Sequence, residues 1–366
     1  MTLEDLALIF VRGIGSRGAA YLVDHFGSAE EVYAASRAAL VDDAKLRPEL
    51  AERIIAGEGM REAKAEVEYC RKHDIRIIAA TDMEYPAPLR EASDRPHVLF
   101  VRGNVEALSL RTLSMVGTRE VSPSGIHVVD KLIGDLAEAI DDLCVVSGLA
   151  YGVDGACHRA ALAHGATTIA VVASVLPEVT PTPHHALAED IVRNGGAIVS
   201  ELHSRTKQNG NLFLARNRII AGMSAGVVVI ESPATGGALS TAEMADSYGR
   251  IVMAVPGRIT DGMSFGTNNL IRSGKARLIL SARDIIDDLG WQITVKEVQS
   301  TTECDDDDLT ANERLILRAF DSAATLDHAA MLAITGLSIG ELAMEMMELE
   351  LKGRIRALPG KRYEKV

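Results

Sequence analysis

Short loops rich in glycine and hydroxyl side chains follow several apolar runs in the middle of this 366-residue chain. Such loops suit anions, because glycine lets backbone N–H groups approach a ligand and the N-terminus of a following helix favours negative charge. No single loop is specific, since a tight turn from a strand into a helix often needs glycine. Together they predict a phosphate-binding edge built from Gly117, Thr118, Ser147, Gly148, Gly236, Gly237, Ser240 and Thr241.

Arginine side chains would add full positive charges beside these loops. Arg119 ends the first loop, and Arg216 and Arg218 lie in a stretch, residues 202–230, that contains no Asp or Glu. Arginine suits phosphate because its planar guanidinium matches phosphate geometry. The net charge of the whole chain is −13, which by itself argues against a nucleic-acid partner. The acid-free stretch nevertheless predicts a local basic patch.

The elements that must position these loops alternate between strands and helices. Helical patterns occupy residues 125–140, 154–164, 184–193 and 241–248. This alternation, with continuous apolar strands, predicts a Rossmann-like α/β fold with a doubly wound, mostly parallel sheet. Ligands of such sheets bind outside the carboxyl ends of the strands. The predicted strands are residues 98–101, 112–116, 143–147, 168–173, 197–200, 227–231, 251–255 and 277–280.

Two further domains are predicted on either side of this core, which is assigned to residues 85–290. Residues 1–84 are expected to form an N-terminal helical domain of helix-hairpin-helix type, in which the turn Gly13-Ile14-Gly15 either holds a phosphate or simply reverses the chain. Residues 291–308 end in aspartates and are expected to form an acidic linker. Residues 309–366 combine three helical patterns with a hairpin, as in a winged helix.

The winged helix differs from a typical reader of duplex DNA. Its candidate recognition helix, residues 339–351, carries several glutamates and no Arg or Lys, whereas recognition helices usually carry basic or amide side chains. The sequence therefore favours protein interaction or packing for this helix. Contact with phosphates remains open for the basic wing, which either touches them or lies in solvent: Lys352, Arg354, Arg356, Lys361 and Arg362.

Other functional classes lack their signatures in this chain. There is no G-x-G-x-x-G loop with a following acidic residue and no Walker A loop, so neither a dinucleotide cofactor nor ATP hydrolysis is expected. The N-terminus lacks the basic region of a signal peptide, and no apolar run reaches the roughly 18 residues of a membrane span. A cytoplasmic protein without cofactor, metal or membrane partner is predicted. Its widely spaced cysteines read as reduced thiols: Cys70, Cys144, Cys157 and Cys304.

Five motifs in a fixed order make the central region recognisable. They are SMVGTR at 114–119, VSGLAYGVD at 146–154, FLARNRIIAG at 213–222, GALSTA at 237–242 and AVPG at 254–257. On these motifs, residues 85–287 closely resemble the bacterial DNA processing protein A family, also called DprA or Smf. Members of that family often carry an N-terminal domain like sterile-alpha-motif or helix-hairpin-helix units and a C-terminal winged helix, which agrees with the flanking regions.

The resemblance implies a single-stranded DNA-binding protein and not an enzyme. Family members bind single-stranded DNA as homodimers, protect incoming DNA in natural transformation and help load the RecA recombinase onto it. Carried over by motif, Arg119 would contact a DNA phosphate. Ser147 and Gly148 would line the same groove. The residues that flank it would be Arg216, Asn217 and Arg218.

One loop departs from the family pattern. Where the family commonly has G-x-G-L-D, then Tyr-Pro and a nearby Lys or Asn, this chain has ASVLPE at 173–178 and TPHH at 182–185. A lysine and an aromatic side chain that family members can use for DNA are therefore absent from this loop. We expect His184 or His185 either to stack on a base in their place or to lie in solvent.

The alternative reading is an enzyme. Residues 236–243 also resemble the Gly-Gly loop of lysine-decarboxylase-like phosphoribohydrolases, which share a Rossmann-like fold and act on nucleoside monophosphates through an Arg and a Glu. Glu243 together with Arg216 or Arg218 would take those two roles. A third reading is a scaffold whose loops bind nothing, against which the arginines in glycine-rich surroundings argue.

Overall fold

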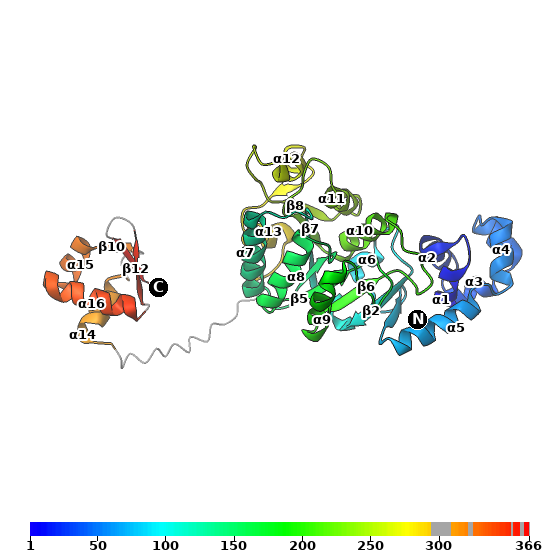
Figure 1. Cartoon of the computed structure of the whole chain (residues 1–366), viewed down its shortest axis with the longest axis horizontal. Helices are drawn as coiled ribbons and strands as arrows, with labels where there is room; N and C mark the ends of the chain where they lie inside the picture. Colours follow the sequence, from blue (N-terminus) through cyan, green and yellow to red (C-terminus); the bar gives the residue numbers. More distant parts are fainter. Residues whose placement is uncertain (294–308, 321–324, 353, 359–361, 366) are drawn as a thin grey trace. The chain divides into compact units, whose positions relative to one another are not determined.

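The structure is a computed structural model that describes residues 1–293, 309–320, 325–352, 354–358 and 362–365. The chain forms two compact units, Met1–Thr294 and Val295–Val366 (Figure 1). Most of the predicted acidic linker, residues 294–308, lies outside the described residues, as does Lys361 of the predicted wing.

A nine-stranded sheet forms the centre of the first unit, in the order β1-β2-β6-β5-β4-β3-β7-β8-β9 (Figure 1). The pairs β1–β2 and β2–β6 are antiparallel, and the other neighbours run parallel. This confirms the predicted mostly parallel α/β fold. The strands are β1 (Arg76–Ala79), β2 (Val98–Gly103), β3 (Arg111–Val116), β4 (Leu143–Ser147), β5 (Thr167–Val171), β6 (Ala197–Ser200), β7 (Gly226–Val229), β8 (Ile251–Ala254) and β9 (Arg277–Leu278).

The strand β1 was not predicted, and the helical reading of the N-terminal region is wrong for residues 76–79. The four residues of β1 follow helix α5 (Met60–Lys72) closely, and the reversal uses Asp74 at a positive φ of 55° where glycine would have marked a turn. One end of β1 is exposed, so the apolar run is too short to register as a buried strand.

Helices cover both faces of the sheet. One face packs against α7 (Pro123–Ala139), α8 (Val153–Ala163) and α13 (Ala282–Leu289), with Met115 of β3 in that core. The other face packs against α10 (Asn211–Met223) and α11 (Gly237–Ser247), with Val116 in the second core. Local sequence sets where these helices begin: Ser122 caps α7 by accepting a hydrogen bond from the Gly125 amide at 3.0 Å, and Pro123 occupies the first turn.

The N-terminal helices are α1 (Leu3–Phe10), α2 (Gly15–Phe26), α3 (Ala29–Ala34), α4 (Pro48–Ile55) and α5. Helices α1 and α5 share a hydrophobic core with one end of the sheet, whereas α2 and α4 pack in a separate cluster with Leu8 of α1. Leu6 of α1 and Cys70 of α5 pack in one cluster with Phe100 of β2 and Ile198 of β6. Helix α9 (His185–Arg193) contributes Ile191 to the same cluster. Helices and sheet therefore form one compact unit.

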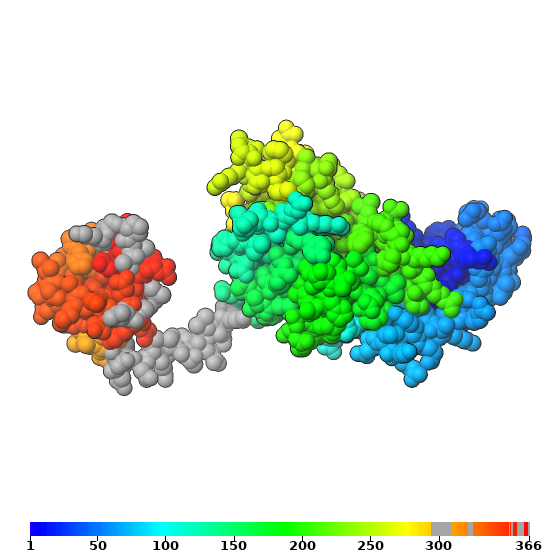
Figure 2. Space-filling view, in the orientation of Figure 1, coloured from blue at the N-terminus to red at the C-terminus, as the bar shows by residue number. Residues whose placement is uncertain are grey.

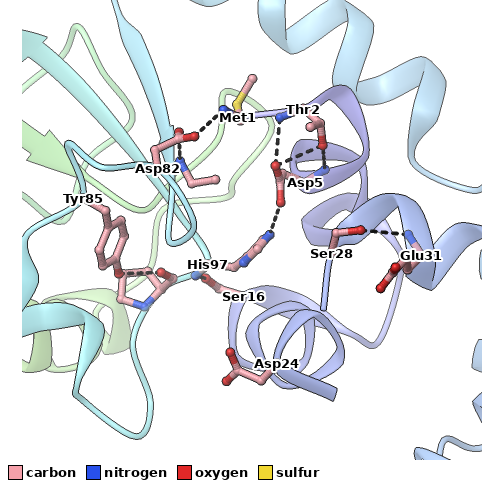
Figure 3. A network of polar contacts seen from close by, with 12 residues as sticks. Met1, Thr2, Asp5, Ser16, Asp24, Ser28, Glu31, Asp82, Tyr85 and His97 are labelled. Carbon is pink, nitrogen blue, oxygen red and sulfur yellow. Dashed lines mark hydrogen bonds and ion pairs between the residues drawn. The ribbon is translucent and has the colours of Figure 1, made fainter. Parts of the chain in front are cut away.

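A buried carboxylate–imidazole contact ties the N-terminal helices to the sheet (Figure 3). The Asp5 carboxylate lies 3.0 Å from Nε2 of His97, and the two side chains are 3% and 0% exposed. The backbone N–H of His97 also donates to Ser16 Oγ of α2 at 3.0 Å. Burial alone would raise the pKa of Asp5, but hydrogen bonds from His97 and Thr2 outweigh it and hold the pKa below its ordinary value.

The second unit contains α14 (Ala311–Ala319), α15 (His328–Thr335) and α16 (Ile339–Leu351). Strands β10 (Thr325–Asp327), β11 (Ile355–Leu358) and β12 (Arg362–Lys365) form a sheet in the order β10-β12-β11, so a third strand joins the predicted hairpin. Two of the wing's basic side chains have acidic partners. Lys352 Nζ lies 2.8 Å from the buried carboxylate of Glu313, and Arg356 lies 3.3 Å from Glu364.

Two further properties concern the described part of both units. Cys70, Cys144 and Cys157 are buried and free, while Cys304 lies outside the described residues. Among the helices described, none alone has the length and apolar composition to cross a membrane; the bent pair α15–α16, with 109° between its helices, passes that test by length and composition only.

We predict that Asp5→Ala destabilises the first unit by about 2–4 kcal/mol at pH 7, because it leaves the buried His97 without its partner and removes a helix cap. Urea unfolding followed by fluorescence of the single tryptophan, Trp291, measures this, since Trp291 packs on the core of the first unit. The folded-state pKa of Asp5 lies below 3.8, so its contribution is present above that value and is lost as the pH falls further.

Asp24→Ala is the matched control. Asp24 bonds Arg95 at 2.5 and 2.7 Å, but its side chain is 56% exposed. Such a pair contributes less than about 1 kcal/mol. Equal losses for the two variants, or a difference between wild type and Asp5→Ala that stays constant from neutral pH to about pH 3, would contradict the assigned role of Asp5.

Candidate nucleic-acid interface

A groove of about 370 Å³ opens at the carboxyl ends of the parallel strands, between the loops that follow β3 and β7. The chain runs from β3 to β4 on one side of this point and from β7 to β8 on the other, which makes it the switch point of the sheet. The structure therefore brings separate predicted loops together. The predicted site residues that line the groove are Gly117, Thr118, Arg119, Arg216, Asn217, Gly236, Gly237 and Thr241.

Arg119 offers an exposed cation to this groove. It forms no ion pair with any residue of the described ranges. Its guanidinium carbon lies 5.7 Å from the centre of the Phe213 ring. A guanidinium held against an aromatic face keeps N–H donors available for an anion. Arg119 thus presents a cation to any anion that enters the groove.

Close packing of two loop backbones fixes the position of Arg119. Gly152 has φ +74°, and a Cβ there would lie 2.2 Å from the carbonyl oxygen of Thr118. The next residue, Val153, donates its amide hydrogen to that same carbonyl at 3.1 Å. A Cβ on Gly117 would lie 2.4 Å from Val153 Cγ2. These two glycines are therefore required for the close approach of the loops.

Arg216 forms the floor of the groove and is 5% exposed. Its Nη1 donates to the carbonyl of Gly148 at 2.6 Å and to the carbonyl of Val171. A Cβ on Gly148 would lie 2.7 Å from Arg216 Nη2 and 2.6 Å from Asp154 Oδ2, so a side chain there would displace these groups. Burial lowers the pKa of Arg216 to about 10, partly opposed by Asp154. Its guanidinium therefore remains charged at neutral pH.

The start of α11 closes another side of the groove. Asn217 donates through Nδ2 to the carbonyl of Gly237 at 3.4 Å, and Thr241 donates through Oγ1 to the same carbonyl at 3.2 Å. These bonds orient the first turn of α11, whose amide N–H groups have no acceptor within the helix. The exposed Gly236 and Gly237 leave those groups accessible to an anion.

Four predicted site residues do not line the groove: Ser147, Gly148, Arg218 and Ser240. Ser147 is fully buried and donates to the Met115 carbonyl at 2.7 Å. Arg218 is 5% exposed and forms an ion pair with Glu201. Direct DNA contact by these four residues remains a prediction, although Gly148 takes part in the groove through Arg216.

The groove is also lined by residues that were not predicted as site residues although they lie inside the five motifs, among them Phe213, Leu214 and Asp154. Leu214 is 51% exposed, which is high for a leucine beside a core helix. Burial raises the pKa of Asp154, and the charge of Arg216 and a 3.3 Å bond from the Ala150 amide oppose that rise. The signal in the sequence that could have identified Phe213 is its position three residues before Arg216 in the same motif, because aromatic and basic side chains together suit a nucleic acid.

The N-terminal helices hold the loop that leads into α10. Glu66 of α5 is 2% exposed and accepts hydrogen bonds from the amide and hydroxyl of Ser204 at 2.7 and 2.5 Å. Phe10 of α1 packs on His203 with ring centres 4.4 Å apart. Arg205 lies 3.7 Å from Glu62. These contacts support the segment that carries Phe213 and Arg216 to the groove.

In the loop that departs from the family pattern, His185 is exposed as one alternative expected, whereas His184 fits neither alternative. His184 is 8% exposed, and its Nδ1 lies 2.8 Å from the Leu149 carbonyl, so it is neither solvated nor available to stack on a base. His185 is exposed and begins α9. No three His, Cys, Asp or Glu side chains among the described residues are grouped so as to hold a metal ion.

Comparisons with known proteins agree with the fold and with the motifs. The model of the family "DNA recombination-mediator protein A" matches residues 76–290, and that of the DprA winged helix domain matches residues 301–361. The DNA processing protein DprA of Streptococcus pneumoniae is 40% identical over 202 residues, covering 55% of this chain and 70% of that protein. Protein Smf of Escherichia coli is 34% identical over 288 residues, covering 78% and 76%.

Two solved structures resemble the chain. DNA processing protein A from Streptococcus pneumoniae has a TM-score of 0.68 and 30% identity, with 78% of this chain and 98% of that chain covered. DNA processing protein A from Helicobacter pylori, described for its single-stranded DNA binding mode, has a TM-score of 0.52 and 27% identity, with 59% and 95% covered. By these matches, this chain belongs to the DNA processing protein A family, DprA or Smf.

Proposed function

We propose that this chain binds single-stranded DNA in the groove between the β3 and β7 loops. The observation that carries the proposal is Arg119, an exposed guanidinium beside an aromatic ring and the open start of a helix. An exposed cation, helix N–H groups and an aromatic face together suit a strand with phosphates and unpaired bases. The Helicobacter pylori relative described for single-stranded DNA binding supports the same ligand.

The family membership extends this proposal to a cellular role. We propose that the chain protects incoming single-stranded DNA in the cytoplasm during natural transformation and assists loading of the RecA recombinase. A protein that covers the strand at a groove and leaves the rest of its surface acidic would suit hand-over to a recombinase, because weak nonspecific affinity favours release.

We propose further that two copies act together. Sheet edges invite pairing with a second chain, and β9 is such an edge, with both its residues exposed. Large apolar side chains are exposed around it: Ile259 is 86% exposed, Phe265 44%, Leu278 47% and Leu280 76%. Figure 2 shows this segment, in yellow, standing out from the first unit. A second copy of the same edge would cover these side chains.

Arg119→Ala is expected to weaken binding of a labelled single-stranded oligonucleotide at least tenfold, because a phosphate loses its cation. Fluorescence anisotropy at several salt concentrations measures this, and the slope of log affinity against log salt should fall by about 0.7 for each phosphate that is no longer neutralised. Arg193→Ala is the control, since Arg193 is a 71% exposed side chain paired with Asp190 on α9. Undetectable binding by wild type, or equal behaviour of the two variants, would contradict the proposal.

The dimer is tested at the apolar edge. Leu280→Glu should convert a dimer to a monomer at micromolar concentration by light scattering, because the charge would be buried without a partner. Met83→Glu, at a side chain that is 94% exposed, should leave the mass unchanged. A wild-type monomer at the same concentration would rule this dimer out.

We also propose that the groove does not release bases from nucleoside monophosphates. Glu243 does not line the groove, and its carboxylate lies 3.8 Å from Lys275. Incubation of the chain with nucleoside monophosphates, followed by chromatography, should yield no free base above a blank. Base release that disappears in Glu243→Ala would instead favour the phosphoribohydrolase reading.

A further inference from the structure

A second cleft, of about 850 Å³, lies beside the DNA-binding groove, and Arg119 lines both. Residues of α7, α8 and the loops before them form its walls. The lining side chains suited to a nucleic-acid strand are Tyr151, Arg159 and Arg119. A role for this cleft rests on the proposed function, because it concerns where a DNA strand goes after it leaves the groove.

Tyr151 is an exposed aromatic held in a fixed place. Its side chain is 49% exposed although the residue sits in the tight turn before α8. The ring stands edge-on to His184, with centres 5.2 Å apart and an interplanar angle of 64°. His184 is itself buried and lies 2.8 Å from the Leu149 carbonyl through Nδ1. A ring supported at its edge keeps a face open, as a stacking platform requires.

The position of Tyr151 relative to Arg119 is set by backbone contacts. Gly152, the next residue, approaches so closely that a Cβ would lie 2.2 Å from the Thr118 carbonyl oxygen and 2.5 Å from the Arg119 carbonyl carbon. Tyr151 and Arg119 therefore belong to two loops that pack backbone against backbone. Arg119 consequently lines the groove together with Phe213 and the cleft together with Tyr151.

The charged side chains that line the cleft suit a nucleic-acid strand and do not suit an uncharged apolar ligand. Arg159 is exposed and has no ion pair among the described residues. Of the carboxylates that line the cleft, Asp130 lies 3.0 Å from His164 Nε2, and Glu120 is exposed next to Arg119. The cleft thus offers two cations and one exposed aromatic ring, a combination that suits the phosphates and unpaired bases of a strand.

We propose that single-stranded DNA crosses Arg119 from the groove into this cleft and stacks an unpaired base on Tyr151, with Arg159 facing the next phosphate. Tyr151 would then replace the aromatic that the loop at 173–185 lacks. Double-stranded DNA cannot use this platform while its bases remain paired, so Tyr151 adds a preference for single strands.

The test uses the full chain and a labelled single-stranded oligonucleotide. Tyr151→Ala should weaken binding about 5- to 100-fold without changing the salt slope, because stacking, unlike a phosphate contact, releases no counterions. Tyr151→Phe, which keeps the ring, should bind within about twofold of wild type. Tyr21→Ala is the matched control, since Tyr21 is 51% exposed on α2 and lines neither cleft.

An oligonucleotide carrying 5-iodouracil gives a second readout, because a halogenated base cross-links to a stacked aromatic on irradiation. Cross-linking to Tyr151 supports the proposal. Wild-type affinity of Tyr151→Ala, together with cross-links only at Phe213, overturns it while leaving the proposed function intact. If Arg119→Ala loses affinity and Tyr151→Ala does not, the proposed function stands and the stacking role of Tyr151 fails. A wild-type protein that binds no single-stranded DNA overturns both proposals.

Discussion

The buried guanidinium of Arg216 is the interaction on which the candidate site depends. It joins three segments that are distant in sequence, because it donates from α10 to carbonyls at the ends of β4 and β5 and lies beside Asp154 of α8. A buried cation is costly unless hydrogen bonds and an opposite charge compensate it, and here both are present. The Nη1 donor of Arg216 is used in hydrogen bonds within the fold. Arg216 therefore shapes the floor of the groove and adds positive potential to the groove.

The three arginines Arg119, Arg216 and Arg218 differ in burial and in their partners. Arg216 is held from within and Arg218 pairs with Glu201, whereas Arg119 reaches the solvent. A buried guanidinium cannot turn its donors to a phosphate in solvent, even where one donor, such as Arg218 Nη1, has no partner, whereas an exposed guanidinium can. The proposed binding site therefore depends on the exposed Arg119, and Gly117 and Gly152 allow the close loop packing that holds its backbone.

Much of this was predictable from the sequence, and the failures have physical causes. Parallel strands must end at one edge, so the loops with Gly117 and Gly237 could be brought together without coordinates. The orientation of α10 could not be predicted from the sequence. Arg216 and Arg218 lie about 200° apart around a helix, and α10 buries both arginines together with apolar residues. A pattern without one polar face does not reveal which arginine meets the groove. Likewise, the orientation of Tyr151 depends on His184, a contact made across the fold.

The net charge of −13 is compatible with the proposed binding of single-stranded DNA once the groove is described. Of the two arginines that line the groove, only Arg119 is exposed. Under the proposed function few phosphates would be neutralised there, so counterion release would supply only part of the affinity. The remainder would come from helix N–H groups and from aromatic faces such as Phe213, which would contact unpaired bases. Because the bases of a duplex are already stacked and paired, and an acidic surface repels its phosphates, both terms favour a single strand over a duplex.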